Sequence, residues 1–128
     1  MVGLVIVSHS CKIAEGVKDL AAQMAPGYDL IVAAGGLENG EIGTDATRIM
    51  DAIQEVDQGD GVCILCDLGS AIMSAETAID LLDDAEHYRI ADAPIVEGAI
   101  VAAVEASGGE DLDSIIAAAE ESRSESKL

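Results

Sequence analysis

The sequence predicts an α/β fold: a three-layer sandwich whose mostly parallel central sheet, in strand order 2-1-3-4, is flanked by helices. Short apolar runs, which suit strands buried on both faces, alternate along the chain with segments whose apolar residues recur at helical spacing. This alternation is typical of a parallel sheet whose crossover helices cover both of its faces. The 128 residues fit one domain. We expect this domain to span residues 1–122, with a polar, disordered tail at residues 123–128.

The first predicted unit is a strand followed by a helix. Gly3 to Ser8 reads GLVIVS, which predicts a buried strand. Ser10 can cap the following helix, and Pro26-Gly27 ends it. The apolar stripe of this helix consists of Ile13, Val17, Leu20 and Met24.

The second unit repeats the pattern. Asp29 to Ala33 predicts a second buried strand, and a glycine-rich loop follows from Gly35 to Gly43. Thr44 is expected to cap the next helix. The residues of this helix that we expect to face inward are Ile49, Ile53 and Val56.

The third unit begins with a strand from Gly61 to Cys66. The turn Asp67-Leu68-Gly69 then leads to Ser70 at the start of a helix. Cys63 and Cys66 lie three residues apart in the strand and so point to opposite faces, which argues against a disulfide or a shared metal. The inner stripe of the helix is predicted to be Ile72, Ala75, Ile79 and Leu82.

The last part of the chain predicts one weak strand, Tyr88 to Ala91, and two helices. The helix from about Pro94 to Ala106 has an apolar face that is too wide for one neighbour, which suggests packing against a second subunit. After Gly108-Gly109, Asp111 is expected to cap the final helix. The apolar positions of that helix are Leu112, Ile115, Ile116 and Ala119.

Candidate functional residues follow three of the predicted strands. His9 follows the first strand, the glycine-rich loop follows the second, and Asp67 follows the third. Ligands of parallel sheets bind beyond the carboxyl ends of the strands, at the point where the strand order reverses. In the order 2-1-3-4 that point lies between the first and third strands, so we expect His9 and Asp67 to face each other.

These residues favour phosphoryl transfer through His9. A histidine reacts through one ring nitrogen when the other keeps its proton, and Asp67 is placed to hold that proton. The helices that begin near Ser10 and Ser70 offer free backbone amides to an anion, and the hydroxyls of Ser70 and Thr44 add donors. The glycines that leave room for backbone to approach are Gly35, Gly36 and Gly69.

Each of these residues also has a purely structural interpretation. The three hydroxyl residues are good helix caps, Asp67 suits a turn, and glycines serve turns. Function is favoured because all of them converge on one edge of the sheet.

The composition argues against several functional classes. With 25 acidic and 6 basic residues, the net charge is −19, so we expect neither nucleic-acid binding nor binding to an anionic membrane surface. The chain lacks a long apolar run, so we expect no membrane span. It lacks paired Cys/His spacing, so we expect no metal site. It also lacks a phosphate-binding GxxxxGK[ST] loop, and we expect no bound cofactor. Three cysteines and an N-terminus without signal-peptide features predict a cytoplasmic protein with free thiols.

Several stretches, in order across residues 3–107, resemble a known family. They are LVIVSHS, AAGG, IGTDATRIMDAI, CDLGSA, SAETAIDLL and APIVEGAIVAA. They are similar to the phosphocarrier subunit of the phosphoenolpyruvate-dependent dihydroxyacetone kinase, a relative of the mannose-type IIA domains of the sugar phosphotransferase system. The DLGSA and APIVEGA stretches favour the kinase subunit over a sugar-transport domain.

The resemblance implies an EIIA-mannose-like fold and a phosphotransferase component, a phosphoenolpyruvate–glycerone phosphotransferase that works through phosphohistidine. His9 would accept the phosphoryl group on Nε2 from the histidine phosphocarrier protein, with phosphoenolpyruvate as the ultimate donor. Asp67 would orient His9, and Thr44, Gly69 and Ser70 would line the phosphoryl site.

The resemblance also implies the partners. The acceptor would be ADP on the nucleotide-binding kinase subunit, which then serves the phosphorylation of dihydroxyacetone. The chain would be a homodimer. Some relatives carry further phosphocarrier domains, whose functions we expect on separate proteins here.

Three alternatives remain. The first is the IIA component of a mannose-type sugar transporter, with the same chemistry and a membrane transporter as recipient. The second is a regulatory domain that lost the chemistry, which the presence of both His9 and Asp67 disfavours. The third is a flavodoxin-like cofactor binder, which the lack of aromatic residues to stack on a flavin disfavours.

Overall fold

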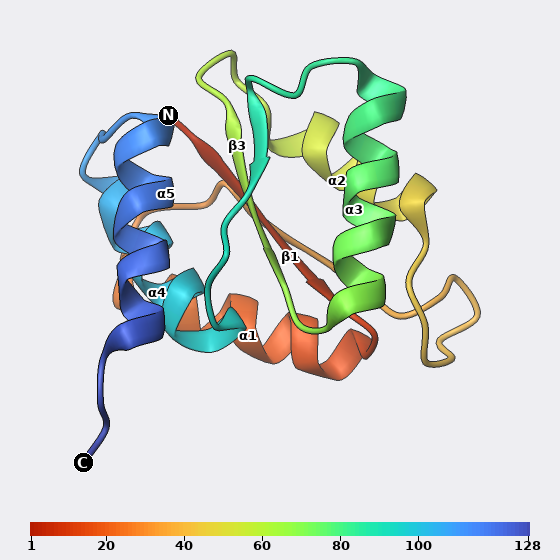
Figure 1. Ribbon diagram of the computed structural model, residues 1–128, viewed down its shortest axis with the longest axis horizontal. Coiled ribbons are helices and arrows are strands. Elements are labelled where there is room, and N and C mark those ends of the chain that lie inside the picture. Colours follow the sequence, from red (N-terminus) through yellow and green to blue (C-terminus); the bar gives the residue numbers. More distant parts are fainter.

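The computed structural model of residues 1–128 has the predicted three-layer architecture (Figure 1). A four-stranded parallel sheet in the order β2-β1-β3-β4 lies between two layers of helices, which confirms the predicted strand order. The strands are β1 (Gly3–Ser8), β2 (Ile31–Gly35), β3 (Val62–Cys66) and β4 (Tyr88–Ile90). The helices are α1 (Cys11–Met24), α2 (Ala46–Val56), α3 (Gly69–Leu82), α4 (Ile95–Ser107) and α5 (Leu112–Glu121), followed by a 3-10 turn at Ser122–Ser124. None of these helices is both long enough and apolar enough to cross a membrane.

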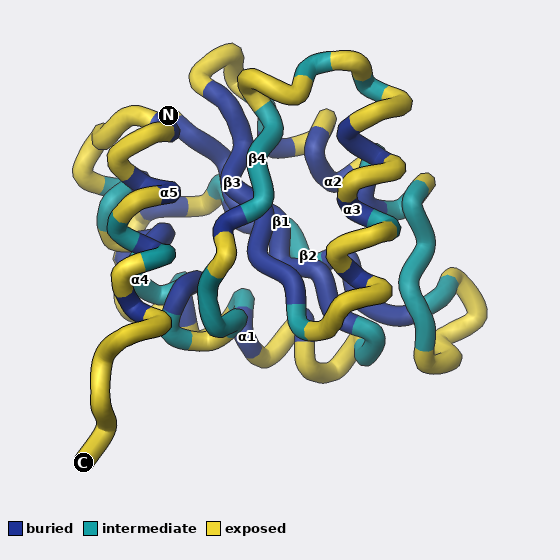
Figure 2. The backbone as a smooth tube through the Cα atoms, in the orientation of Figure 1, coloured by how far each residue is buried: buried dark blue, intermediate teal, exposed yellow.

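The sheet separates two hydrophobic cores, because successive side chains of a strand point to opposite faces. In β1, Leu4 and Ile6 face the core under α1, α4 and α5, whereas Val5 and Val7 face the core under α2 and α3. Figure 2 shows the buried strands as a central layer between helices that are exposed on their outer sides. The same alternation places Cys63 and Cys66 in different cores, as predicted.

Small side chains bring the helices close to the sheet. The buried residues of α4 are Gly98, Ala99, Ala102, Ala103 and Ala106. A Cβ atom on Gly98 would lie 3.1 Å from the Leu65 Cδ1 atom, so the glycine allows close contact with β3. Close helix packing therefore forms these cores without Phe or Trp.

The predicted apolar stripe of α1 is wrong at three of its four positions. Ile13, Leu20 and Met24 are 50%, 45% and 54% exposed, and the buried residues are Ala14, Val17 and Ala21. The buried face keeps the helical spacing, but it is built from small residues because α1 packs closely against α4 and β2.

The predicted inner stripe of α3 also needs one correction. Ile72 is 39% exposed, and the buried residues of this helix are Ala71, Ala75, Ala78 and Ile79. Here too, alanine lies inward and a larger apolar residue lies at the surface.

Two predicted boundaries differ from the structure. The cap of α2 is Asp45, whose carboxylate accepts a hydrogen bond from the Thr47 amide at 2.9 Å, so Thr44 is not the cap. Strand β2 lies two residues later than predicted, because its register with β1 continues as far as Gly35 opposite Ser8.

The apolar face of α4 is covered within the chain by α1, α5 and the strands β1 and β3. Its width therefore requires no second subunit, and the predicted homodimer gains no support from this helix.

At the C-terminus, the 3-10 turn carries Arg123 and Ser124 beyond the predicted domain boundary at residue 122, and Arg123 pairs with Asp92. Disorder of the remaining tail stays a prediction.

Gly35 should be essential for the contact between β2 and α1. A Cβ atom there would lie 2.6 Å from both the Ser10 carbonyl oxygen and the Ala14 Cβ atom. We expect Gly35→Ala to lower the free energy of unfolding by about 1–3 kcal/mol, through this overpacking. Urea denaturation monitored by circular dichroism measures the change.

Gly16→Ala is the matched control, since Gly16 lies in α1 with nothing within 4 Å of the added Cβ atom. It should stabilise the chain by about 0.5–1 kcal/mol through helix propensity. Equal effects of the two substitutions would contradict the packing explanation.

Candidate functional site

The predicted convergence of His9 and Asp67 is confirmed. β1 and β3 are neighbouring parallel strands, with Val7 paired to Cys66, so the residues that follow them emerge side by side. The His9 Nδ1 atom lies 2.9 Å from Asp67 Oδ1. The helices α1 and α3 begin two residues after His9 and Asp67, at Cys11 and Gly69, and their N-termini flank the pair.

Asp67 is held by hydrogen bonds from both strand ends. Its Oδ2 atom accepts from the Ser8 hydroxyl at 2.8 Å and from the His9 amide at 3.0 Å. Its Oδ1 atom accepts from the Leu68 amide at 2.7 Å and contacts the His9 ring. The carboxylate therefore has one orientation, and it fixes the imidazole relative to β3.

The pKa of Asp67 lies below its ordinary value. Burial by itself would raise the pKa of this carboxyl, but hydrogen bonds from the backbone and ring of His9, the Ser8 hydroxyl and the Leu68 amide together outweigh burial. Asp67 is therefore an anion near neutral pH.

The contacts of His9 define its tautomer. An ionised carboxylate can only accept a hydrogen bond, so the Nδ1 atom beside Asp67 must carry a proton. In the neutral ring Nε2 then has a free lone pair, and the Ser70 hydroxyl donates to it. The His9 side chain is 22% exposed. The site thus presents a nucleophilic nitrogen at the protein surface.

The start of α3 supplies unpaired donors near that nitrogen. Leu68, at the N-cap position, makes no side-chain capping bond, and the amides of Gly69 and Ser70 donate to no group in the chain. A Cβ atom on Gly69 would meet nothing within 4 Å, so the space beside this backbone is open. The partial positive charge of a helix N-terminus suits an anion at this position.

The remaining predicted site residues have structural contacts of their own. The Ser10 hydroxyl accepts from the Ile13 amide at 3.3 Å and thus caps α1, as predicted. Gly35 packs against the backbone of Ser10, and Gly36, with φ +70°, lies close to the Cys11 amide. These glycines position the start of α1. Their predicted place beside a phosphoryl group stays a prediction.

Thr44 is tied to α3 instead of capping α2. Its hydroxyl lies 2.7 Å from the Ser74 hydroxyl, and the adjacent Gly43 amide donates to the His9 carbonyl at 2.9 Å. The glycine-rich loop therefore closes over the backbone of His9 and connects it to α3.

Sequence reasoning missed Ser8 and Ser74. Ser8 is the only buried polar side chain in the strands, apart from the cysteines. Its position as a polar residue at the end of an apolar run could have indicated a role in the site. Ser74 lies one helical turn after Ser70, which places the two hydroxyls on one face of α3.

Other residues with potential chemistry lie apart from the site or lack partners. His87 contacts Asp84 at 2.7 Å on the surface. The three cysteines are free, and only Cys11 is exposed. No group of three or more His, Cys, Asp or Glu side chains is arranged to hold a metal ion.

Comparison with known proteins identifies relatives across nearly the whole chain. Residues 3–116 match the family described as PTS system fructose IIA component. The chain is 48% identical over 121 residues to the PEP-dependent dihydroxyacetone kinase, phosphoryl donor subunit DhaM, of Pantoea ananatis. That alignment covers 91% of this chain and 26% of the relative, so the chain spans about a quarter of that protein's length.

Two further proteins match this chain over most of the length of both aligned chains. The PTS-dependent dihydroxyacetone kinase, phosphotransferase subunit DhaM, of Lactococcus lactis is 41% identical over 88% of this chain and 89% of its own length. A crystal structure of a protein of unknown function, EF1359, superposes with a TM-score of 0.86 at 36% identity, covering 100% of this chain and 99% of the other.

The Asp67 contact predicts an Nδ1-protonated tautomer of neutral His9. Nitrogen-15 NMR of the ring should show a protonated Nδ1 and a bare Nε2, and Asp67→Ala should abolish this preference. Ser70→Ala should preserve it, because the Ser70 contact lies on the other nitrogen. A protonated Nε2 in the neutral wild-type ring would contradict the assignment.

The lowered pKa of Asp67 predicts a pH-dependent stability difference. A carboxyl with a depressed folded-state pKa contributes stability above its ordinary value of 3.8 and loses it as the pH falls through the folded value. Asp67→Asn should therefore destabilise the chain at pH 7, and the difference should shrink in acid. Urea unfolding of both proteins from pH 7 down to pH 3 measures it. A constant difference would refute this linkage.

Proposed function

The chain belongs to the family of PTS system fructose IIA components, and we propose that it is a phosphocarrier that accepts a phosphoryl group on His9 and passes it on. One observation carries the proposal: the imidazole is oriented through Nδ1 by an ionised Asp67, while Nε2 is presented at the surface. An oriented, neutral imidazole with a free lone pair is the form of histidine that acts as a nucleophile.

In the proposed transfer, the lone pair of His9 Nε2 attacks the phosphorus of a phosphohistidine on a donor protein. The new N–P bond forms as the donor's N–P bond breaks, and the bonding electrons return to the donor imidazole. The His9 ring gains positive charge, which the Asp67 carboxylate, 2.9 Å from Nδ1, stabilises without removing its proton. The acceptor step reverses these events, with an oxygen of ADP as the nucleophile.

The phosphoryl oxygens would be bound at the start of α3. The Ser70 hydroxyl contacts Nε2 in the free protein, so it must rotate when the N–P bond forms, and it can then donate to a phosphoryl oxygen. The free amides of Gly69 and Ser70 supply further donors. Thr44 would line the same site, where the contact of its hydroxyl with the Ser74 hydroxyl holds it against α3.

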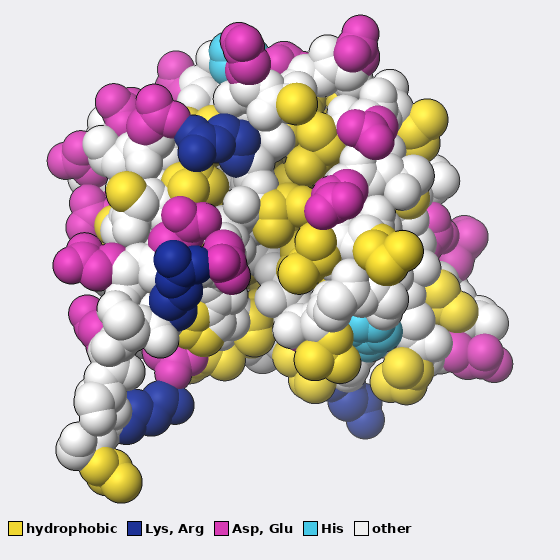
Figure 3. Space-filling view, viewed as in Figure 1, with side chains coloured by type: hydrophobic (Ala, Val, Ile, Leu, Met, Phe, Trp, Pro, Cys, Tyr) yellow, Lys and Arg dark blue, Asp and Glu magenta, His cyan; other side chains and the backbone are white.

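Large exposed apolar side chains near His9 support protein partners for both steps. Ile42 precedes the Gly43 amide that binds the His9 carbonyl, and Leu68 follows Asp67; they are 72% and 65% exposed. Ile13, in the first turn of α1, and Met73, in the second turn of α3, are 50% and 69% exposed. Figure 3 shows apolar side chains gathered around the N-terminal end of α3. Exposed apolar patches of this kind mark protein interaction sites.

We assign the partners from the relatives. Proteins named as phosphoryl donor subunits of dihydroxyacetone kinases match this chain at 45–48% identity, which favours a kinase over a sugar transporter as recipient. The proposed donor is the histidine phosphocarrier protein, charged ultimately by phosphoenolpyruvate, and the proposed acceptor is ADP on the nucleotide-binding kinase subunit. The proposal also includes a cytoplasmic location and a homodimer. The mass of the homodimer can be measured by light scattering.

Phosphorylation of His9 can be tested by intact-mass analysis. After incubation with phosphoenolpyruvate, the general phosphotransferase enzyme and the histidine phosphocarrier protein, we expect an acid-labile gain of one phosphoryl group. The gain should be absent with ATP alone and in His9→Ala. No gain in the wild type would refute the phosphocarrier function.

Asp67→Asn should slow charging by about 10²–10⁴-fold, the range associated with loss of a group that assists proton placement. Asp84→Asn provides a control, because Asp84 makes the same kind of contact with His87 at a distant surface site. This control should charge at the wild-type rate.

A further inference from the structure

The two contacts of the His9 ring form the arrangement that serine hydrolases use. The Ser70 hydroxyl is hydrogen-bonded to Nε2, and Asp67 Oδ1 lies 2.9 Å from Nδ1, so a serine, a histidine and an aspartate are joined in that order. In this arrangement the histidine takes the proton of the serine, and the aspartate fixes the tautomer and stabilises the charged ring. Such triads recur on unrelated folds and are recognised by their geometry.

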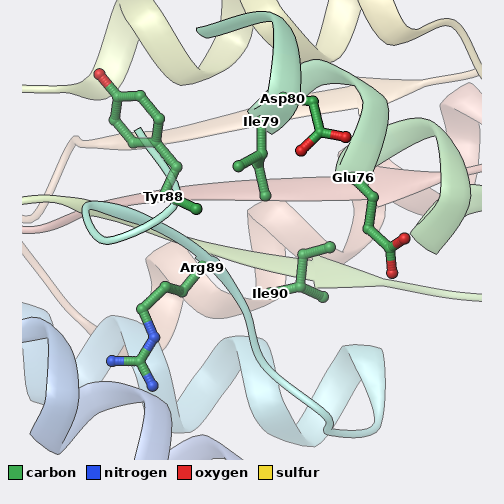
Figure 4. Close-up of a pocket in the computed structure, with 7 residues that line it drawn as sticks. Glu76, Ile79, Asp80, Tyr88, Arg89 and Ile90 are labelled. Carbon is green, nitrogen blue, oxygen red and sulfur yellow. The ribbon is translucent and has the colours of Figure 1, made fainter. Parts of the chain in front are cut away.

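This triad occurs once in the chain. His87, the only other histidine, contacts Asp84 at 2.7 Å through Nδ1, but no hydroxyl is bonded to its Nε2. The hollow of about 410 Å³ between α3 and β4, shown in Figure 4, is lined by no histidine. Its one hydroxyl, that of Tyr88, is bonded to Asp57. A hydroxyl beside a histidine base is therefore found only at Ser70.

The start of α3 also provides an oxyanion hole. The amides of Gly69 and Ser70 have no acceptor in the chain, and the first amides of a helix project beyond its N-terminus. In one class of triad enzymes, the amide of the nucleophilic serine and a nearby amide bind the oxyanion. A Cβ atom on Gly69 would meet nothing within 4 Å, so a substrate carbonyl has room beside this backbone. The nucleophile, the base and the oxyanion donors thus lie together.

The exposure and charge of the site indicate the class of substrate. Ser70 is exposed, and so are the apolar side chains of Leu68 and Met73 beside it in sequence. An open site with small apolar patches suits a short acyl chain and gives a long one no enclosing pocket. The net charge of −19 disfavours an anionic substrate. These features favour a small, neutral ester.

We propose that the unphosphorylated protein is also a serine esterase for small neutral esters, with Ser70 as the nucleophile and His9 as the general base. The Ser70 Oγ atom attacks the carbonyl carbon while Nε2 takes its proton, and the two free amides bind the oxyanion. The bond from the carbonyl carbon to the alcohol oxygen then breaks, and Nε2 returns the proton to the leaving alcohol.

Water completes the reaction. Its oxygen attacks the acyl group on Ser70 while Nε2 takes one of its protons, and that proton passes to the Ser70 oxygen as the acyl bond breaks. The net reaction converts ester and water into acid and alcohol. A phosphoryl group on Nε2 would occupy the lone pair that accepts the proton, so hydrolysis and phosphoryl transfer exclude each other at His9. The triad is complete in the free protein, so this activity does not depend on the proposed phosphocarrier function.

Labelling with an alkyl fluorophosphonate tests the nucleophile. The bond from Ser70 Oγ to phosphorus forms as the phosphorus–fluorine bond breaks, and fluoride leaves while His9 takes the proton. We expect one acid-stable adduct, which peptide mass spectrometry places on Ser70. Ser70→Ala and His9→Ala should each slow labelling at least about 100-fold. An acid-labile adduct on His9, or no adduct in the wild type, would overturn the proposal.

Two matched variants serve as controls for labelling. Ser114→Ala removes an exposed serine in the first turn of α5, whose hydroxyl contacts no histidine. His87→Ala removes a ring that has a carboxylate partner but no serine. Both variants should be labelled at the wild-type rate. A loss as large as that in Ser70→Ala would show that labelling does not depend on the triad.

Hydrolysis of 4-nitrophenyl acetate tests turnover. An exposed imidazole can also accept the acetyl group directly, so the comparison with Ser70→Ala decides between the two routes. We expect this variant to hydrolyse the ester at least about tenfold more slowly than the wild type, and wild-type protein to carry acetyl on Ser70. An unchanged rate in Ser70→Ala would assign hydrolysis to His9 alone and overturn the proposal. Failure of phosphoenolpyruvate-dependent charging would refute only the phosphocarrier function, because neither assay uses a phosphohistidine donor.

Discussion

The Asp67 carboxylate is the interaction on which the rest of the site depends. It lies at the end of β3, yet three of its four hydrogen bonds come from Ser8 and His9 at the end of β1. A single side chain thereby joins the two central strands, fixes the histidine ring and determines which ring nitrogen is free. The parallel order of the sheet makes this possible, because the carboxyl ends of β1 and β3 are neighbours. The chemistry of the site follows directly from the topology.

The sequence predicted the topology and the central pair, because both depend on strong local signals. Apolar runs bounded by glycine, proline and capping residues identify strands and helices, and the strand order places His9 and Asp67 together. The helix faces were harder to predict. Where α1 and α3 pack closely, alanine lies inward, and Ile13, Leu20, Met24 and Ile72 lie at the surface. Periodicity that weights residues by hydrophobicity alone selects the large side chains and misses this arrangement.

The finer contacts of the site were also beyond prediction from sequence, because they join residues that are far apart in the chain. The bond between Thr44 and Ser74 bridges 30 positions, and the contact between His9 and Ser70 bridges 61. Asp45, one residue later, caps α2, so the Thr44 hydroxyl contacts Ser74 instead. Side-chain pairing across the fold depends on the final positions of the loops, and local sequence patterns do not record those positions.

The uncapped start of α3 has a thermodynamic consequence. A helix whose first amides lack partners is less stable than a capped one, and a phosphoryl group on His9 would act as the missing cap. The stabilisation that the phosphoryl group gives to α3 is lost when the group leaves His9. The stability of α3 and the phosphoryl-transfer potential of His9 are therefore linked. A residue in the first turn that caps α3 by itself would reduce this stabilisation and so make release of the phosphoryl group easier.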